Sequence, residues 1–244
     1  MPRSAMRYAR NKRKRRVRFF KRGLANRTAT VLARRTGSTS AISEAFNGVA
    51  GHRGALLGRE LRTNLIYADT FQMTNASGAA SIQHFAVNGL YDPDTTGTGH
   101  QPRGFDQLMA LYDHYEVLGC KVTVQCALAE AAAQAQCVGI LIYDGTGAST
   151  TVIDQVENRR AKTMLITPGQ TGTISVSVNP HKFLGRPNGQ SSMIGTNSGN
   201  PSDLVYARVF GLCPDGASTN TVNALITLEY RVRFIEPKQP TASL

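Results

Sequence analysis

The first 35 residues hold the side chains whose type and spacing indicate a definite chemistry, which is the binding of a polyanion. They include 14 Lys or Arg and no Asp or Glu, and the first acidic residue is Glu44. The rest of the chain has 14 basic residues against 16 acidic ones, so the terminal segment accounts for the whole net charge of +12. A strongly basic tail on a nearly neutral body predicts a polyanionic partner for the tail, and nucleic acid is the first candidate.

The cations of this segment are expected to neutralise phosphates with release of counterions, so that binding weakens as salt rises. Tyr8, Phe19 and Phe20 could stack on bases, at about 1 to 3 kcal/mol per base. The predicted nucleic-acid-binding residues are Arg3, Arg7, Arg10, Lys12, Arg13, Lys14, Arg15, Arg16, Arg18, Phe19, Phe20, Lys21, Arg22 and Arg27. The unbroken run Lys12, Arg13, Lys14, Arg15 and Arg16 also fits a nuclear localisation signal. A solvated tail and an Arg-rich transit peptide are the alternatives.

Composition divides the chain into three parts. Residues 1–40 are expected to be a disordered basic arm, because like charges oppose compaction. Residues 41–60, rich in Gly, Ser and Ala, are expected to be a linker, and residues 61–244 have the size of one domain. No apolar run reaches the roughly 18 residues of a membrane span, and no secretory signal precedes the arm, so no membrane partner is expected.

The four cysteines lie in apolar surroundings without paired spacing. We therefore expect reduced core thiols, with no disulfide framework, no zinc and no other cofactor.

Alternation of apolar and polar residues with a period of two predicts that the domain is built of strands. It is clearest at 222–235, where every second residue from Val222 to Phe234 is apolar, and it recurs at 121–128 and 173–179. Five weaker segments are bounded by turn residues: 64–73, 81–88, 137–143, 162–166 and 204–212. The spacing of Phe105, Leu108, Met109 and Tyr112 predicts one short helix, and 151–158 fits a second.

Eight strands with some long connections favour an all-β fold with two antiparallel sheets, namely a single eight-stranded jelly roll with one or two short helices in its loops. The immunoglobulin-like sandwich is the alternative, weakened by the absence of Trp and of a suitable Cys pair.

The sequence contains no motif that would support catalysis. Its Gly-rich segments lack the Gly-Lys-Ser/Thr end of a phosphate loop, and no nucleophile elbow is present. Asp92 and Asp94 imitate the start of a calcium loop, but Arg103 stands where a bidentate Glu is needed. Asp92, Pro93, Asp94 and His100 are therefore expected to form a turn or an interface between subunits, and no enzymatic activity is expected.

The segment 88–118 carries a resemblance to a known family. It contains Asn88-Gly89-Leu90-Tyr91-Asp92-Pro93-Asp94, then Gly99-His100-Gln101-Pro102, then Gly104-Phe105-Asp106-Gln107, followed by Tyr112 and Tyr115. With the basic arm and the long last strand, it resembles capsid proteins of circovirus-like, Rep-encoding circular single-stranded DNA viruses. The resemblance implies a jelly-roll shell domain, a T=1 shell of sixty copies, an internal arm that packages circular single-stranded DNA, and location in the virion and the host nucleus. Host nuclear import receptors and host cell attachment factors are the further partners that it implies.

Two other functions remain as alternatives at this stage. A non-viral nucleic-acid-binding module, ribosomal or chromatin-like, would usually carry a basic face on its folded part as well. A jelly-roll capsid of a small RNA virus would show the same arm.

Arg231 and Arg233 lie on the more polar face of the last strand, where they could contact nucleic acid or pair with Glu229 or Glu236.

Overall fold

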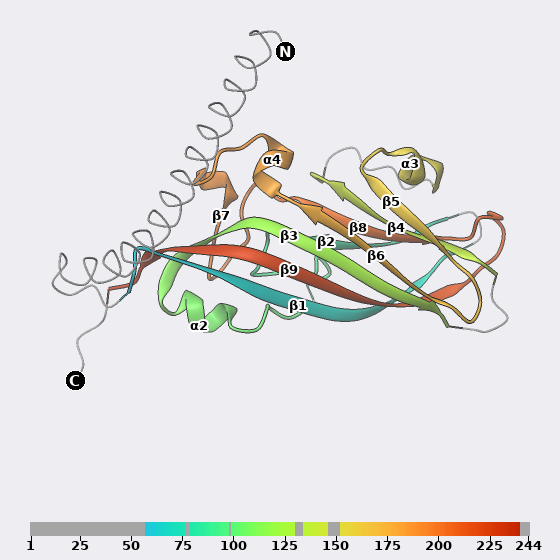
Figure 1. Ribbon diagram of the computed structural model, residues 1–244, viewed down its shortest axis with the longest axis horizontal. Coiled ribbons are helices and arrows are strands. Elements are labelled where there is room, and N and C mark those ends of the chain that lie inside the picture. Colours follow the sequence, from blue (N-terminus) through green and yellow to red (C-terminus); the bar gives the residue numbers. More distant parts are fainter. Residues whose placement is uncertain (1–56, 77–78, 98, 130–133, 146–151, 240–244) are drawn as a thin grey trace, which may run out of the picture. The chain divides into compact units, whose positions relative to one another are not determined.

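The computed structural model describes residues 57–76, 79–97, 99–129, 134–145 and 152–239, which form two antiparallel sheets (Figure 1). One sheet runs β1 (Glu60–Thr74), β9 (Thr221–Pro237), β3 (Tyr112–Leu128) and β6 (Thr171–Val178), with β7 (Ile194–Thr196) added at the start of β3. The other runs β2 (Ser81–Ala86), β8 (Tyr206–Leu212), β4 (Gln136–Tyr143) and β5 (Ala161–Ile166). The helices in these residues are α2 (Phe105–Met109), α3 (Val152–Glu157), α4 (Pro180–Leu184) and the 3-10 turn η1 (Ser191–Met193).

The strand order identifies the fold. Leaving the short β7 aside, the first four strands pair antiparallel with the last four in reverse order: β1 with β9, β2 with β8, β3 with β6, and β4 with β5. This is a long hairpin rolled up so that successive pairs alternate between two sheets, which is a double-sheet jelly roll. The predicted fold class is therefore confirmed, and the immunoglobulin-like alternative is wrong.

The core lies between the two sheets and follows from alternation. On β9 every residue predicted for the apolar face is buried, from Val222 through Tyr230 to Phe234, whereas Asn223, Glu229 and Arg231 are exposed. β3 contributes Val122 and Val124 in the same way. Because side chains alternate between the faces of a strand, one row of apolar residues closes the core while the other row forms the outer face of the sheet.

Strand β3 is much longer than its predicted 121–128, since it begins at Tyr112. Its first half was missed because Asp113 and Glu116 interrupt the apolar pattern and because a β-bulge lies between Val117 and Gly119. An extra residue in a strand shifts the side chains to the opposite face and so breaks the period of two. Tyr112, predicted as the end of a helix, instead opens this strand, and α2 stops at Met109.

The connection from β6 to β8 holds structure for which no prediction was made. In α4, the Asn179 side chain caps the helix by accepting a hydrogen bond from the Lys182 backbone N–H at 3.0 Å, Pro180 occupies the first turn, and Gly185 ends the helix at a φ of 66°. β7 follows and pairs with the N-terminal half of β3. At the N-terminal end of the β domain, β1 begins at Glu60, the last residue of the expected linker.

Candidate functional site

The predicted arm contacts, from Arg3 to Arg27, and the nuclear localisation run Lys12 to Arg16 lie outside the described residues. They remain predictions from sequence. The other predicted site residues, Asp92, Pro93, Asp94 and His100, are described and lie in the connection between β2 and α2.

Asp94 organises a tight turn. One carboxylate oxygen accepts hydrogen bonds from the Thr96 N–H at 3.1 Å and from the Gln83 side chain at 3.2 Å, and the other accepts from the Thr96 hydroxyl at 2.7 Å. The Pro93 carbonyl accepts from the Ala86 N–H at 2.7 Å. Asp94 is buried, and both of its oxygens are used within the chain. The geometry is that of a turn held by an Asp side chain.

Asp92 and His100 lie around Tyr67. The His100 ring meets the Tyr67 ring edge-on at 4.7 Å between centroids, and the Tyr67 hydroxyl donates to Asp69 at 3.0 Å. Burial raises the pKa of Tyr67 strongly, and Asp69 raises it further. Burial, and then the Asp94 charge, raise the pKa of Asp92. Within the described residues, no three His, Cys, Asp or Glu side chains converge as a metal site requires.

The Asn88–Pro93 segment, which carries the sequence resemblance, is held by a hydrogen-bond network centred on Asn200. The Asn200 side-chain oxygen accepts from the N–H groups of Tyr91 and Asp92 at 3.1 and 3.2 Å and lies 3.2 Å from the Tyr115 hydroxyl, while its amide donates to the Asp92 carbonyl at 3.0 Å. The Tyr115 hydroxyl in turn accepts from the Leu90 N–H at 3.0 Å.

Two of the motif residues, Asn88 and Tyr115, have further contacts that fix these connections. Asn88 is fully buried and links its own segment to the residues just before β8. Its side chain donates to the Asp203 carbonyl and accepts from the Val205 N–H, each at 2.8 Å. Gly195 allows the Tyr115 ring to lie against β7, because a Cβ there would be 2.3 Å from the ring. In this chain the motif therefore fixes the shape of the two long connections.

The two arginines of β9 have different surroundings, although sequence treated them alike. Arg233 contacts the fully buried Glu116 and lies 3.5 Å from Glu60, so its predicted partners, Glu229 and Glu236, are wrong. Glu229 instead pairs with Lys121 at 3.1 Å, and Glu236 lies 2.9 Å from His114. The sequence missed Glu116 because it is far from Arg233 in the chain, on a stretch not recognised as a strand.

The buried Glu116 connects three elements. Its carboxylate contacts Arg233 on β9, accepts the Gly189 N–H at 2.5 Å from the connection after α4, and lies 3.3 Å from the buried His181 ring of α4. A buried charge is tolerated only where it is paired and hydrogen-bonded, and Glu116 has both kinds of contact. The cluster thereby fastens α4 and the following turn to the β1–β9–β3–β6 sheet.

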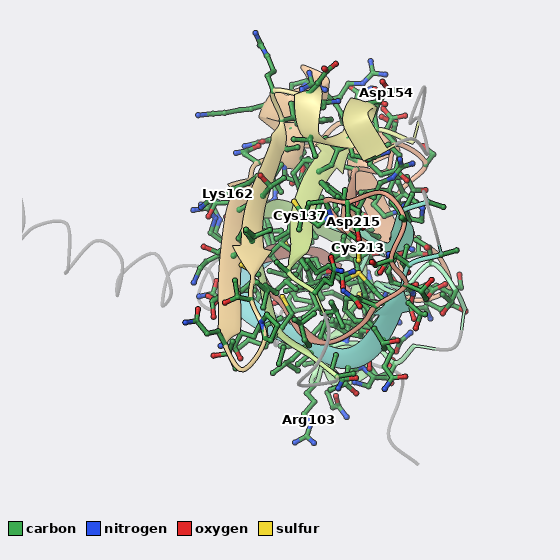
Figure 2. The ribbon with its side chains drawn as sticks, turned by 90° about the vertical axis from the view of Figure 1, so that its right-hand side faces the viewer. Arg103, Cys137, Asp154, Lys162, Cys213 and Asp215 are labelled. Atoms are coloured by element: carbon green, nitrogen blue, oxygen red, sulfur yellow. The ribbon has the colours of Figure 1, made fainter. Side chains whose placement is uncertain are left out.

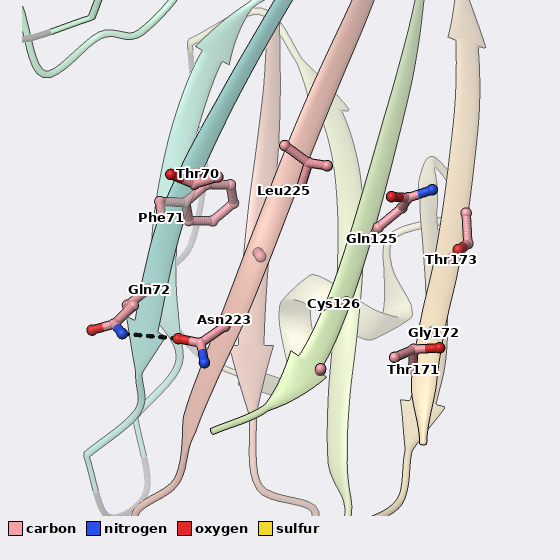
Figure 3. A pocket seen from close by; sticks show the side chains of 12 residues that line it. Thr70, Phe71, Gln72, Gln125, Cys126, Thr171, Gly172, Thr173, Asn223 and Leu225 are labelled. Carbon is pink, nitrogen blue, oxygen red and sulfur yellow. Dashed lines mark hydrogen bonds between the residues drawn. The ribbon is translucent and has the colours of Figure 1, made fainter. Parts of the chain in front are cut away.

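The outer face of this sheet has a hollow of about 630 Å³, lined by neutral side chains (Figure 3). We call it the neutral hollow; its polar residues include Thr70, Gln72, Gln125, Thr173 and Asn223. Gln72 donates to Asn223 at 2.8 Å across the two strands. No lining residue is charged, so this part of the face offers hydrogen bonds without attracting or repelling an ion.

The cysteines are all free thiols. Cys120, Cys126 and Cys213 are buried and Cys137 is partly so, and burial raises the pKa of Cys120, Cys126 and Cys137. Such thiols are unreactive because the thiolate is disfavoured. Among the residues described, no helix has the length and apolar character needed to cross a bilayer.

No protein-family model matches the chain, and no curated protein matches it in sequence. Among solved structures it is similar to that of Desmodium yellow mottle tymovirus, at 15% identity over 78% of this chain and 99% of the other, with a TM-score of 0.39. A decameric BFDV capsid protein is 12% identical over 73% and 100%, with a TM-score of 0.42. The mud crab tombus-like virus structure is 10% identical over 79% and 98%, with a TM-score of 0.44.

Proposed function

We propose that this chain is a viral coat protein that assembles with copies of itself into a closed shell and packages nucleic acid with its basic arm. The observation that carries the proposal is the separation of charge: an arm of 14 cations without an acid is joined to a jelly-roll domain whose net charge is close to zero. A near-neutral domain can pack against copies of itself while the arm neutralises phosphate.

The resemblance of segment 88–118 supports a more specific form of the proposal. In this form sixty copies build a T=1 shell around circular single-stranded DNA, and the run Lys12 to Arg16 directs the protein to the nucleus through host import receptors. Sixty arms of 14 charges would neutralise about 840 phosphates, which fits a small genome. Of the four residues predicted to form a turn or an interface, the exposed His100 and the partly exposed Asp92 are then available for contacts between subunits, whereas the buried Pro93 and Asp94 hold the turn. The coat protein acts without enzymatic activity, and attachment to host cells falls to its outer loops.

The arm is tested by replacing all five residues from Lys12 to Arg16 with Gln in the full chain. The nucleic acid recovered with the protein should fall sharply, and nuclear accumulation of a fluorescent fusion should be lost, because both depend on this charge. The far-UV circular dichroism of the β domain should not change. Replacing the exposed Arg103 and Arg159 of the domain with Gln is the control and should leave both properties intact. Unchanged packaging in the arm variant would contradict the proposal.

A further inference from the structure

A second hollow on the outer face of the β1–β9–β3–β6 sheet surrounds Arg231. It has a volume of about 360 Å³, and its polar lining consists of Asn64, Lys121, Ser177, Glu229 and Arg231. We call it the Arg231 hollow. Four strands contribute these residues: β1, β3, β6 and β9. The face on which it lies is turned toward the viewer in Figure 1, where none of the labelled helices crosses it.

Arg231 is held across the neighbouring strand β3. One of its terminal nitrogens donates to the Leu118 carbonyl at 3.4 Å, at the β-bulge. Gly119 leaves room for this arrangement, because a Cβ at that position would lie 3.1 Å from the same nitrogen. A guanidinium has five N–H donors, so most of them remain available on the surface of the sheet. The side chain is thus positioned before any ligand arrives, which reduces the entropy lost on binding.

Charge balance distinguishes Arg231 from the other cations of this face. Arg233 is neutralised by Glu116 and Glu60, and Lys121 by Glu229. Among the described residues, Arg231 is in no ion pair, and its guanidinium donates to the uncharged Leu118 carbonyl. The Arg231 hollow therefore holds two cations and one carboxylate, with a net charge of +1, and the neutral hollow on the same face adds no charge.

We propose that the Arg231 hollow binds a backbone phosphate of a single-stranded nucleic acid, a contact separate from those of the arm. Arg231 would grip two phosphate oxygens with its planar fork, while Lys121, Asn64 and Ser177 would supply further donors. This inference rests on the proposed function, which makes nucleic acid the partner. Position supports it: Asn64 lies opposite Arg231 and only four residues, about 13 Å of extended chain, after Glu60, where β1 begins. The linker that carries the arm joins this sheet at the start of β1, so nucleic acid bound by the arm is tethered to the same sheet.

The test measures chemical accessibility of arginines in the full-length protein. An arginine-specific dicarbonyl reagent is applied at low salt with and without an oligothymidylate of about thirty nucleotides, and the modified residues are identified by mass spectrometry. Arg231 should be modified several-fold less in the presence of the oligonucleotide. Arg103, which extends away from the domain in Figure 2, should be unaffected. Protection of the arm arginines without protection of Arg231 would overturn this inference and leave the proposed function standing.

Variants give an independent readout from the salt dependence of oligonucleotide binding. Arg231→Gln should reduce the slope of log K against log salt by about 0.7, the value for one single-strand phosphate, while Arg103→Gln should not change it. Glu229→Gln should strengthen binding a few-fold, because it removes the carboxylate that neutralises Lys121. Equal slopes for wild type and Arg231→Gln would refute the site. If millimolar inorganic phosphate alone protects Arg231 as fully as the oligonucleotide does, the hollow is a general anion site and the assignment to nucleic acid fails.

Discussion

Replacing Glu116 with Gln should cost far more stability than any other loss of a carboxylate on this sheet. Glu116 is fully buried and contacts Arg233, whose side chain is 19% exposed, and it accepts the Gly189 N–H at 2.5 Å. Gln has nearly the same shape, and its single oxygen can still accept that N–H. The substitution then removes the negative charge beside Arg233 and replaces the oxygen that accepts from Arg233 with an NH2 group, which cannot accept.

The magnitude follows from the burial of the pair. Breaking a buried ion pair by removing one partner typically costs about 3 to 5 kcal/mol. Here Glu60 remains 3.5 Å from Arg233, and the guanidinium is not fully desolvated. Both facts reduce the penalty, so we expect a loss of about 2 to 3 kcal/mol in the free energy of unfolding. Glu229→Gln is the matched control: its pair with Lys121 is about half exposed, and its loss should cost less than about 1 kcal/mol.

The assay is urea unfolding followed by far-UV circular dichroism in high salt, which keeps the arm from binding residual nucleic acid. The double variant Glu116→Gln with Arg233→Gln completes a double-mutant cycle. It should lose clearly less stability than the sum of the two single variants, because neither charge is left without its partner. The reasoning is refuted if Glu116→Gln costs no more than Glu229→Gln, or if the two single losses simply add.

Two further predictions concern the connections and the second sheet. Asn200→Ala should lower the free energy of unfolding in urea by about 2 kcal/mol, because the N–H groups of Tyr91 and Asp92 lose their acceptor. A change of less than about 0.5 kcal/mol would contradict the role of this network. Burial, and then the charge of Arg208, lower the pKa of His84, so the unfolded chain binds the proton more readily. The stability that neutral His84 provides is complete above about pH 6.5 and is lost as pH falls through its lower folded pKa. On acidification below pH 6.5 the Tm should therefore fall more steeply in wild type than in His84→Gln, and parallel curves would show the reasoning to be wrong.

The sequence predicted the fold where a strand alternates without interruption. β9 shows this best, since its apolar row is the buried row. It failed at Tyr112–Gly119, where a bulge and buried charged residues remove the alternation. β7 has only three residues, too few for a period to be recognised. α4 was missed although Asn179, Pro180 and Gly185 are ordinary signals for the start and end of a helix.

The residues of the candidate site were likewise predictable from the sequence only in part. Charge counting could locate the arm and could identify Arg231 and Arg233 as the cations of the last strand. It could not tell them apart, because their difference depends on Glu116 and Gly119 of β3, which are remote in sequence. Pairing between distant strands decides which cation is neutralised, and that information is present only in the folded chain.

The central claim is that the chain builds a closed shell around nucleic acid, and electron microscopy of the purified full-length protein tests it most directly. The account predicts uniform closed particles, about 20 nm across, as expected of a symmetric assembly of many copies. Their contents should raise the ratio of absorbance at 260 to 280 nm and resist added nuclease until the particles are opened, after which digestion by DNase rather than RNase would identify DNA. A monodisperse monomer across a range of salt and pH, without protected nucleic acid, would contradict it.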